Sequence, residues 1–411
     1  MSESWCEDVE GRLRKIPSRR VVVAHLERPR GSRMAWFAAV TSMIAVLASG
    51  CRGLDARPGK DAGTKEDALD DLGTWILMDI PTSADLLSGA SLSSDLYVVG
   101  SSATILRSTN MGSNWVTAGV ADFGGGYSYP KFRSIGGSGA RDIWVAGDLT
   151  SSQGILIHST DRGQSWETID IGISNSLQGV WSADVDHVYV VSYDGGIVST
   201  SNGGAQWSCV FDDPNILLWG VWGSRINDIY AVGATVAFSI TDADLSNVGD
   251  GGAAEGGVLS ITGGVVLHSS DEGLTWQTMT AAPCPLWHVS GVPDGTAVYA
   301  AGSCGTIAWT TDHGASWSTT GDPAVGNVLE LTSVAVSPGG VPCFTSPSGI
   351  VGWVVASASG WSARGVESLP ARLYEGGTAV RTTPLGLWFD SDGSPWAVGS
   401  SGFLWHDSAS R

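Results

Sequence analysis

One eight-residue pattern recurs along the chain and constrains its fold more than any other feature. Ser or Thr stands first in it, Asp or Asn third, Gly fifth and Trp eighth. The close copies end at Trp115, Trp166, Trp207, Trp276 and Trp317. A degraded copy, ASASGW, ends at Trp361. Such regular recurrence indicates a repeat protein, so the number of repeat units, and not the length of 411 residues, determines the expected domain organisation.

Each copy lies within a predicted unit of four strands, A to D. Two alternating apolar runs precede the motif, as in LLWGVWGSRINDIYAVG before the fourth copy, and a short apolar run follows its Trp. Period-two patterns broken by Gly, Asn and Asp are typical of strands and hairpins. The motif then occupies the C to D hairpin. There the Ser and Asp side chains can accept hydrogen bonds from the backbone amides of the turn, Gly supplies a positive φ and Trp packs on the sheet.

The spacing of the units predicts a closed ring. Successive intervals from Trp75 to Trp361 are 40, 51, 41, 69, 41 and 44 residues, which makes six units. The sequence after Pro384 supplies strands A, B and C of a seventh, and residues 75–80 supply its missing D strand. We therefore expect an all-β protein, a single seven-bladed β-propeller closed by its N-terminal strand, which removes the exposed sheet edges.

These motifs resemble the Asp-box (BNR) repeats of sialidases, sortilin-type receptors, xyloglucanases and the photosystem II assembly and stability factor. The resemblance covers residues 73–411 and is specific for the fold but weak for activity. By analogy with propellers in which loops carry function, it implies a structural role for the Asp-box residues. They are Asn110, Trp115, Asp161, Trp166, Asn202, Trp207, Asp271, Trp276, Asp312 and Trp317.

The N-terminal region reads as an export signal. Met34–Leu47 is an uncharged apolar run preceded by arginines and followed by Ala-Ser-Gly-Cys, so it resembles a bacterial lipobox with Cys51 as the acylated residue. We expect a lipoprotein signal region over 1–50, a flexible tether over 51–72 and the propeller over 73–411. Because Arg52 follows the cysteine, sorting rules of Gram-negative lipoproteins imply an extracytoplasmic protein at the outer membrane.

Charge excludes one class of partner. Beyond residue 50 the chain has 14 Lys and Arg against 36 Asp and Glu, a balance of −22. A surface this acidic repels nucleic acid and anionic lipid headgroups, so we expect no nucleic-acid partner and contact with the membrane through the lipid anchor only. We expect a monomer.

Two insertions point to the face formed by the D to A and B to C loops, here called the top face. One runs over 123–133 and brings aromatic and basic residues to an acidic chain, and the other runs over 234–264. Aromatic rings around a concave face suit a peptide or a sugar, although they could equally just hold the loop in place. The candidate ligand-binding residues are Tyr127, Tyr129, Lys131, Phe132, Arg133, Trp287 and His288.

Neither metal nor cofactor is indicated. Asp242, Asp244 and Asp250 suggest a calcium loop, but Gly is missing at its sixth place and Glu at its twelfth, which favours a solvated acidic loop. Cys284 and Cys304 fall in top loops of one blade, so we predict a disulfide between them. Cys209 and Cys343 lie in different blades and are expected to be free.

Catalysis is the weaker of two functional hypotheses. The three arginines and the Arg-Ile-Pro motif of sialidases are not found, and Asp95, Asp142 and Asp228 fit turn capping. A glycoside hydrolase needs two paired carboxylates. The top loops offer Asp122, Asp148, Asp194, Asp212 and Asp213, with no spacing that selects a pair. We predict a non-enzymatic binding or assembly scaffold whose top face meets an envelope protein or glycan. The alternative is a sialidase- or xyloglucanase-like glycoside hydrolase.

Overall fold

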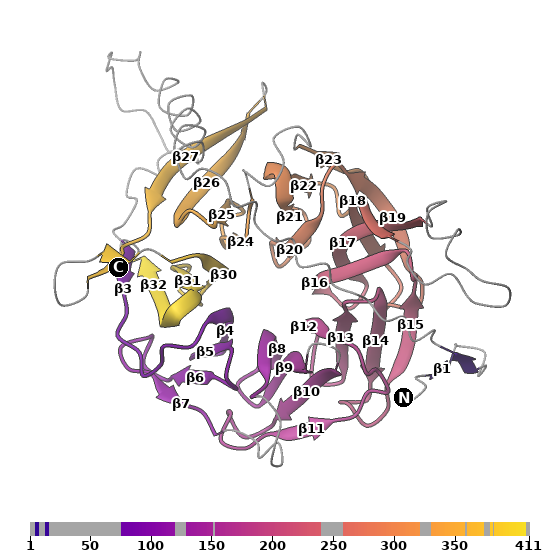
Figure 1. The fold of residues 1–411 in the computed structure, drawn as a ribbon, viewed down its shortest axis with the longest axis horizontal. Coiled ribbons are helices and arrows are strands. Elements are labelled where there is room, and N and C mark those ends of the chain that lie inside the picture. Colours follow the sequence, from indigo (N-terminus) through magenta and orange to yellow (C-terminus); the bar gives the residue numbers. More distant parts are fainter. Residues whose placement is uncertain are drawn as a thin grey trace, which may run out of the picture.

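Seven four-stranded antiparallel sheets surround a common axis in the computed structural model (Figure 1). The structure describes residues 5–7, 13–15 and 75–407, except 120–128, 151–152, 240–257, 321–329, 358–359, 374–378 and 381. The predicted seven-bladed propeller is confirmed. None of the described residues belongs to a helix long and apolar enough to cross a membrane.

The first three blades follow one another along the chain, and each runs from an inner to an outer strand. Blade 1 consists of β4 (Leu86–Leu92), β5 (Asp95–Gly100), β6 (Ile105–Ser108) and β7 (Val116–Thr117). Blade 2 consists of β8 (Lys131–Gly139), β9 (Asp142–Thr150), β10 (Gln153–Ser159) and β11 (Glu167–Ile169). Blade 3 consists of β12 (Leu177–Ser182), β13 (His187–Ser192), β14 (Gly196–Ser201) and β15 (Ser208–Asp212).

The next three blades repeat this order. Blade 4 consists of β16 (Ile216–Arg225), β17 (Asp228–Ser239), β18 (Val258–Ser269) and β19 (Gln277–Ala282). Blade 5 consists of β20 (Leu286–Gly291), β21 (Val298–Gly302), β22 (Ile307–Thr310) and β23 (Ser318–Thr319). Blade 6 consists of β24 (Ser333–Val336), β25 (Pro342–Ser346), β26 (Ile350–Ser357) and β27 (Gly360–Ser368).

Blade 7 joins the two ends of the propeller. It consists of β30 (Pro384–Phe389), β31 (Pro395–Gly399), β32 (Phe403–Asp407) and, as outermost strand, β3 (Trp75–Leu77). Antiparallel pairing of Trp75 with Asp407 and of Leu77 with Trp405 closes the ring as predicted. Two short hairpins lie outside the blades: β1 (Trp5–Glu7) with β2 (Leu13–Lys15), and β28 (Arg372–Leu373) with β29 (Ala379–Val380).

The core lies between neighbouring blades. Every residue of β5 and β31 is buried, whereas both residues of the outer strand β7 are exposed. This gradient explains the nearly continuous apolar B-strand sequences, because both faces of such a strand meet another blade. In one core cluster, Tyr97 and Val99 of blade 1 pack with Phe132 and Ile143 of blade 2.

The Asp-box turn forms part of the same joints. The Ser or Thr hydroxyl accepts a hydrogen bond from the Gly amide, and the Asp or Asn Oδ1 accepts one from the backbone amide four residues later, as between Ser316 and Asp312 at 2.9 Å. The side chain four residues after Asp161, Asp271 and Asp312 is Ser or Thr, whose hydroxyl donates to the second carboxylate oxygen at 2.5 to 2.6 Å. Asn110 and Asn202 are instead followed by Asn114 and Gln206.

The motif glycine contacts the preceding blade. A Cβ added at Gly204 would lie 2.7 Å from the Trp144 ring, and one at Gly273 would lie 2.5 Å from the Tyr189 ring. Both glycines have positive φ values, 88° and 78°. The glycine is therefore required twice, by the left-handed turn and by the close approach of an aromatic side chain from the neighbouring blade.

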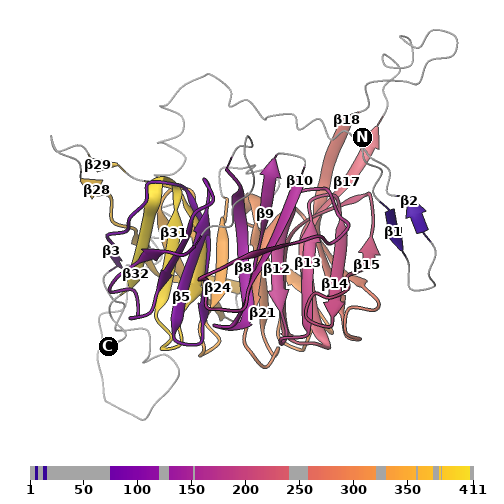
Figure 2. The same cartoon turned by 90° about the horizontal axis from the view of Figure 1, so that it is seen from below.

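The long insertion of blade 4 corrects one expectation. Residues 234–264 were expected as a top loop, but β17 and β18 continue into it and pair as far as Ser239 and Val258. The two strands project beyond the rest of the ring in Figure 2. Alternating Thr, Val, Ile and Ala residues in this stretch favour strand pairing, which the Gly-rich composition had obscured. The calcium candidates Asp242, Asp244 and Asp250 lie outside the described residues.

The cysteines follow the prediction in part. Cys284 and Cys304 form the expected disulfide, with their Cα atoms 6.1 Å apart, and Cys343 is a buried free thiol. The expectation of a free Cys209 is wrong, because this residue is disulfide-bonded. Cys51 lies outside the described residues.

Candidate functional site: the top rim of the inner strands

The inner strands share an irregularity at their top ends. In six blades the pairing of strand A with strand B slips by one residue, which leaves a single residue unpaired. Bulges of this kind re-aim a side chain and are common beside binding sites. The bulge residues are Leu87, Arg133, Gln178, Trp219, Trp287 and Leu385. All six are half-buried, while the residue before each is buried.

Polar groups connect the bulges of blades 2 and 3. Arg133 Nε lies 2.6 Å from Asp148 Oδ2, and the Asp148 side chain is almost completely buried. The Ser176 hydroxyl donates to the other oxygen of Asp148, and the Gln178 amide donates to the Ser176 hydroxyl. Burial lowers the pKa of Lys131, and the neighbouring Arg133 charge acts in the same direction. In this section of the rim, the charges of Arg133 and Asp148 therefore compensate each other, and the Gln178 amide adds a hydrogen-bonding group.

Aromatic side chains continue the rim across blades 3, 4 and 5. Trp219 makes edge-to-face contacts with Tyr193 on one side and with Trp287 on the other, at ring-centroid distances of 5.9 and 4.5 Å. The ring planes meet at 74° and 77°. Burial raises the pKa of Tyr193, and the Arg133 charge opposes this shift, so Arg133 is within electrostatic reach of the aromatic section.

We call the polar and the aromatic section together the rim arc. It joins side chains from four consecutive blades. Its members are Arg133, Asp148, Gln178, Tyr193, Trp219 and Trp287.

The predicted ligand-binding residues divide between the rim and the core. Arg133 and Trp287 belong to the rim arc, and Lys131 lies half-buried two residues before Arg133. Tyr129 is 78% exposed. The expectation that Phe132 binds a ligand is wrong, because its side chain is 0% exposed and packs between blades 1 and 2. Side chains alternate along β8, so those of its two neighbours lie on the rim side. Tyr127 lies outside the described residues.

His288 is half-buried beside Trp287, and its Nδ1 is enclosed without a hydrogen-bond partner among the described residues. Burial lowers the pKa of His288, although a backbone hydrogen bond with Val334 acts in the opposite direction. The imidazole is therefore neutral near pH 7, and the structure gives it a packing role at the joint between blades 5 and 6.

Gln178, Tyr193 and Trp219 were missed at the sequence level. A local signal does exist, since the bulge residue precedes Gly in LQGVW, LWGVW and PLGLW. In each of these segments the Gly follows the point at which the strand register slips. Recognising the signal requires knowledge that these glycines mark bulges rather than ordinary strand positions.

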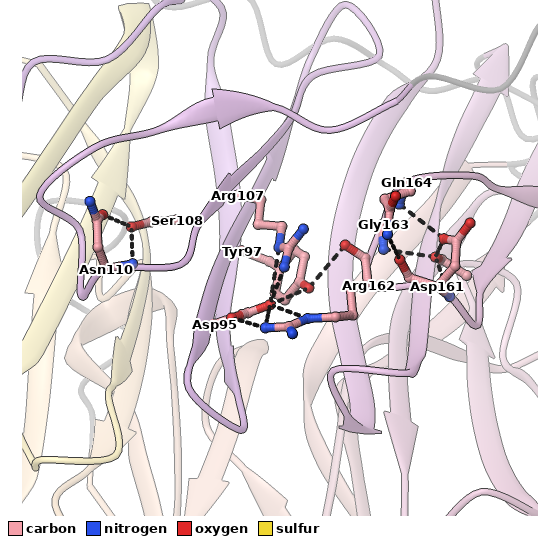
Figure 3. A network of polar contacts seen from close by, with 10 residues as sticks. Asp95, Tyr97, Arg107, Ser108, Asn110, Asp161, Arg162, Gly163 and Gln164 are labelled. Carbon is pink, nitrogen blue, oxygen red and sulfur yellow. Dashed lines mark hydrogen bonds and ion pairs between the residues drawn. The ribbon is translucent and has the colours of Figure 1, made fainter.

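The opposite face carries a second polar arrangement, shown in Figure 3. Asp95 is 0% exposed and forms salt bridges with Arg107 from its own blade and with Arg162 from the Asp-box of blade 2. The Nη2 atoms of the two arginines lie 2.7 and 2.8 Å from its carboxylate. The Tyr97 hydroxyl donates to Asp95. Burial alone would raise the pKa of Asp95, but the two arginines outweigh it and the pKa is lowered.

Similar groups recur at other joints. Asp142 pairs with His158, and Asp228 pairs with His268, each at 2.9 Å from the imidazole Nε2. Both imidazoles stack on the aromatic side chain of the adjacent strand, Trp144 or Tyr230. The turn-capping interpretation of these aspartates is thus extended: they also hold basic side chains at the joints between blades.

A small cavity of about 120 Å³ lies beside the Asp-box of blade 5. His268, Met279 and His313 contribute to its lining. It is far along the sheets from the rim arc, next to the motif turn. Within the described residues, no group of three or more His, Cys, Asp or Glu side chains is placed to hold a metal ion.

Comparisons with known proteins agree with this architecture. A sequence family described as "Photosynthesis system II assembly factor YCF48" matches residues 69–243. Over these residues the chain is similar to that family. No curated relative matches it.

Solved structures similar to this seven-bladed propeller are distant in sequence. One titled "YCF48 bound to D1 peptide" has 17% identity and a TM-score of 0.55, and the match covers 81% of this chain and 96% of that one. YCF48 from Cyanidioschyzon merolae has 13% identity and a TM-score of 0.52, covering 81% and 98%. A GH74 xyloglucanase from Xanthomonas campestris has 15% identity and a TM-score of 0.54, covering 81% of this chain but 53% of that one. Likeness at this identity establishes the fold.

Proposed function

We propose that the protein is a non-enzymatic binding or assembly scaffold that holds an extended polypeptide segment across the rim arc. The observation that carries this proposal is the arc itself, which offers hydrogen-bonding and aromatic side chains from four consecutive blades along one rim. Half-buried bulge residues are already held by packing, so a ligand need not order them at an entropic cost.

The comparisons support a polypeptide as the partner. The family matched over residues 69–243 is described as an assembly factor, and one fold neighbour is a propeller bound to a peptide. We propose in addition that the scaffold is extracytoplasmic, monomeric and free of cofactors, and that acylated Cys51 anchors it at the outer membrane. Metabolic labelling with a palmitate analogue tests the anchor, because Cys51→Ala should abolish the label.

Peptide selection on the whole chain tests the function. A displayed library of random 12-residue peptides should yield binders that Gln178→Ala or Trp219→Ala weakens about tenfold, a typical loss for an interface residue worth more than 1 kcal/mol. Leu385→Ala is the matched control, because it alters an equivalent bulge in blade 7, outside the arc. A library that yields no binder, or binders equally sensitive to Leu385→Ala, would contradict the proposal.

A glycoside hydrolase is the second candidate, supported by the xyloglucanase neighbour and by one carboxyl group. Burial raises the pKa of Glu330, in the loop before β24, as a general acid requires. Asp148 and Asp194 are already engaged, by Arg133 and Ser176 and by Asn175 and Ser192 respectively. Release of reducing sugar from a polysaccharide panel, abolished by Glu330→Gln, would establish this alternative.

A further inference from the structure

The aromatic section of the rim arc lies in the most acidic part of the ring. Residues 170–320, which include blades 3, 4 and 5, contain fifteen Asp and Glu but one Lys or Arg, Arg225. Arg225 ends β16 at the A to B turn, on the face opposite the rim. The charge of the chain is therefore not spread evenly, and the half of the ring with the aromatic side chains has almost no cation of its own.

Two of these acidic residues belong to top-face loops next to the strands that carry the aromatic rings. Asp194 directly follows Tyr193, and its carboxylate accepts hydrogen bonds from the Ser192 hydroxyl at 2.6 Å and from the Asn175 amide, which leave its negative charge in place. The backbone of Asp213 packs against Gly195, where an added Cβ would lie 2.4 Å from the Asp213 carbonyl oxygen. The B to C turn of blade 3 and the loop entering blade 4 thus pack against each other and bring Asp194 and Asp213 to the top face, where Asn215 holds the Asp213 carboxylate.

The rings themselves have a geometry suited to a cation. Trp219 stands nearly perpendicular to both Tyr193 and Trp287, so the three half-buried rings form consecutive corners and not a flat stack. The face of an aromatic ring is negative and attracts a Lys ammonium or Arg guanidinium, most strongly for Trp. Arg133, whose charge reaches Tyr193, is already paired with Asp148.

We propose that the polypeptide held by the rim arc is basic, and that one of its Lys or Arg side chains packs against Tyr193, Trp219 and Trp287 beside Asp194 and Asp213. This inference rests on the proposed function and specifies its ligand. The acidic half-ring accelerates the approach of such a segment at low ionic strength and repels an acidic one.

Titration of the full chain with three matched peptides tests the inference. The probes are acetyl-Gly-Ser-Lys-Trp-Lys-Ser-Gly-amide and its analogues with Gln or Glu in place of both lysines. We expect the Lys peptide to bind about tenfold more tightly than the Gln peptide in 20 mM salt, and the Glu peptide to bind more weakly still. A rise to 300 mM salt should reduce the advantage of the Lys peptide.

Variants separate the ring contribution from charge. Trp219→Leu keeps an apolar side chain but removes the indole face, so it should reduce the preference for Lys over Gln about tenfold. Asp194→Asn should lower affinity mainly at low salt, and Leu385→Ala should leave it unchanged. Thermal unfolding of each variant shows whether the ring remains folded.

Equal binding of the three peptides, a preference for Glu, or no binding of the Lys peptide would overturn the inference. The proposed scaffold function fails separately, when library selection yields no peptide that depends on the arc. Selection of neutral or acidic peptides that depend on Trp219 would preserve the scaffold and refute the basic ligand.

Discussion

The buried carboxylate of Asp95 is stable because basic side chains reach it from two directions. Asp95 binds Arg107 from the adjacent strand and Arg162 from the next blade. Sequence alone identified Asp95 as a turn residue, because its position before a B strand is a local signal. It could not supply Arg162 as a partner, because that contact joins residues 67 positions apart.

Removal of this carboxylate should destabilise the ring. We expect Asp95→Ala to lower the free energy of unfolding by about 3 kcal/mol, because it leaves two arginines near a buried site without their partner. Glu167→Ala, which removes an exposed carboxylate from β11, should change stability by less than about 0.5 kcal/mol. Denaturant unfolding measures both, and equal effects would contradict the joint role of Asp95.

Acid should destabilise the native state through the Asp-box turns. Hydrogen bonds from the side chains and amides of Ser165 and Ser316 hold the pKa of Asp161 and Asp312 at about 2, below the usual 3.8. The carboxylates therefore stabilise the folded state above about pH 4, and this contribution is lost as the pH falls from about 4 to about 2.

The double variant Asp161→Asn/Asp312→Asn tests this pH dependence. Asn110 and Asn202 show that the turn accepts Asn, so we expect a folded protein whose melting temperature falls less steeply between pH 4 and 2 than that of the wild type. Parallel curves for the two proteins would show that these carboxylates do not set the acid response.

At the scale of elements, the Asp-box hairpin was predictable because its hydrogen bonds join residues within a few positions of one another. The rim bulges and the long β17 and β18 pair were not, because a slip in register depends on the partner strand and on the neighbouring blade. Arg133 became a candidate through the unusual composition of the 123–133 insertion, whereas Gln178 and Trp219 lie in ordinary strand sequences and were missed.

A pair of glycine substitutions tests the contact between hairpin and preceding blade. Gly204 and Gly172 both have positive φ values, 88° and 73°, but only at Gly204 would a Cβ meet another side chain, the Trp144 ring at 2.7 Å. Gly172→Ala should cost about 1 kcal/mol for the left-handed conformation alone. Gly204→Ala should cost about 1 to 3 kcal/mol more because of overpacking, and equal losses in denaturant unfolding would refute the contact.

At the scale of the whole molecule, β3 determines whether the ring closes. Its pairing with β32 covers the outer edge of blade 7 and buries Trp75 in the cluster shared by blades 6 and 7. A chain that begins at residue 81 should therefore unfold at lower temperature and associate through the exposed strand edge. A chain that begins at Gly73 is the control, and light scattering with thermal unfolding distinguishes the two.

The most direct test of the central claim is a map of where a selected peptide touches the propeller. A photo-reactive residue placed in the peptide can be crosslinked to the unmodified chain, and the crosslinked positions can be identified by mass spectrometry. The account predicts crosslinks around Gln178 and Trp219 on the rim and none around exposed Val185 on the opposite face. Crosslinks around Val185 alone would contradict binding at the rim arc.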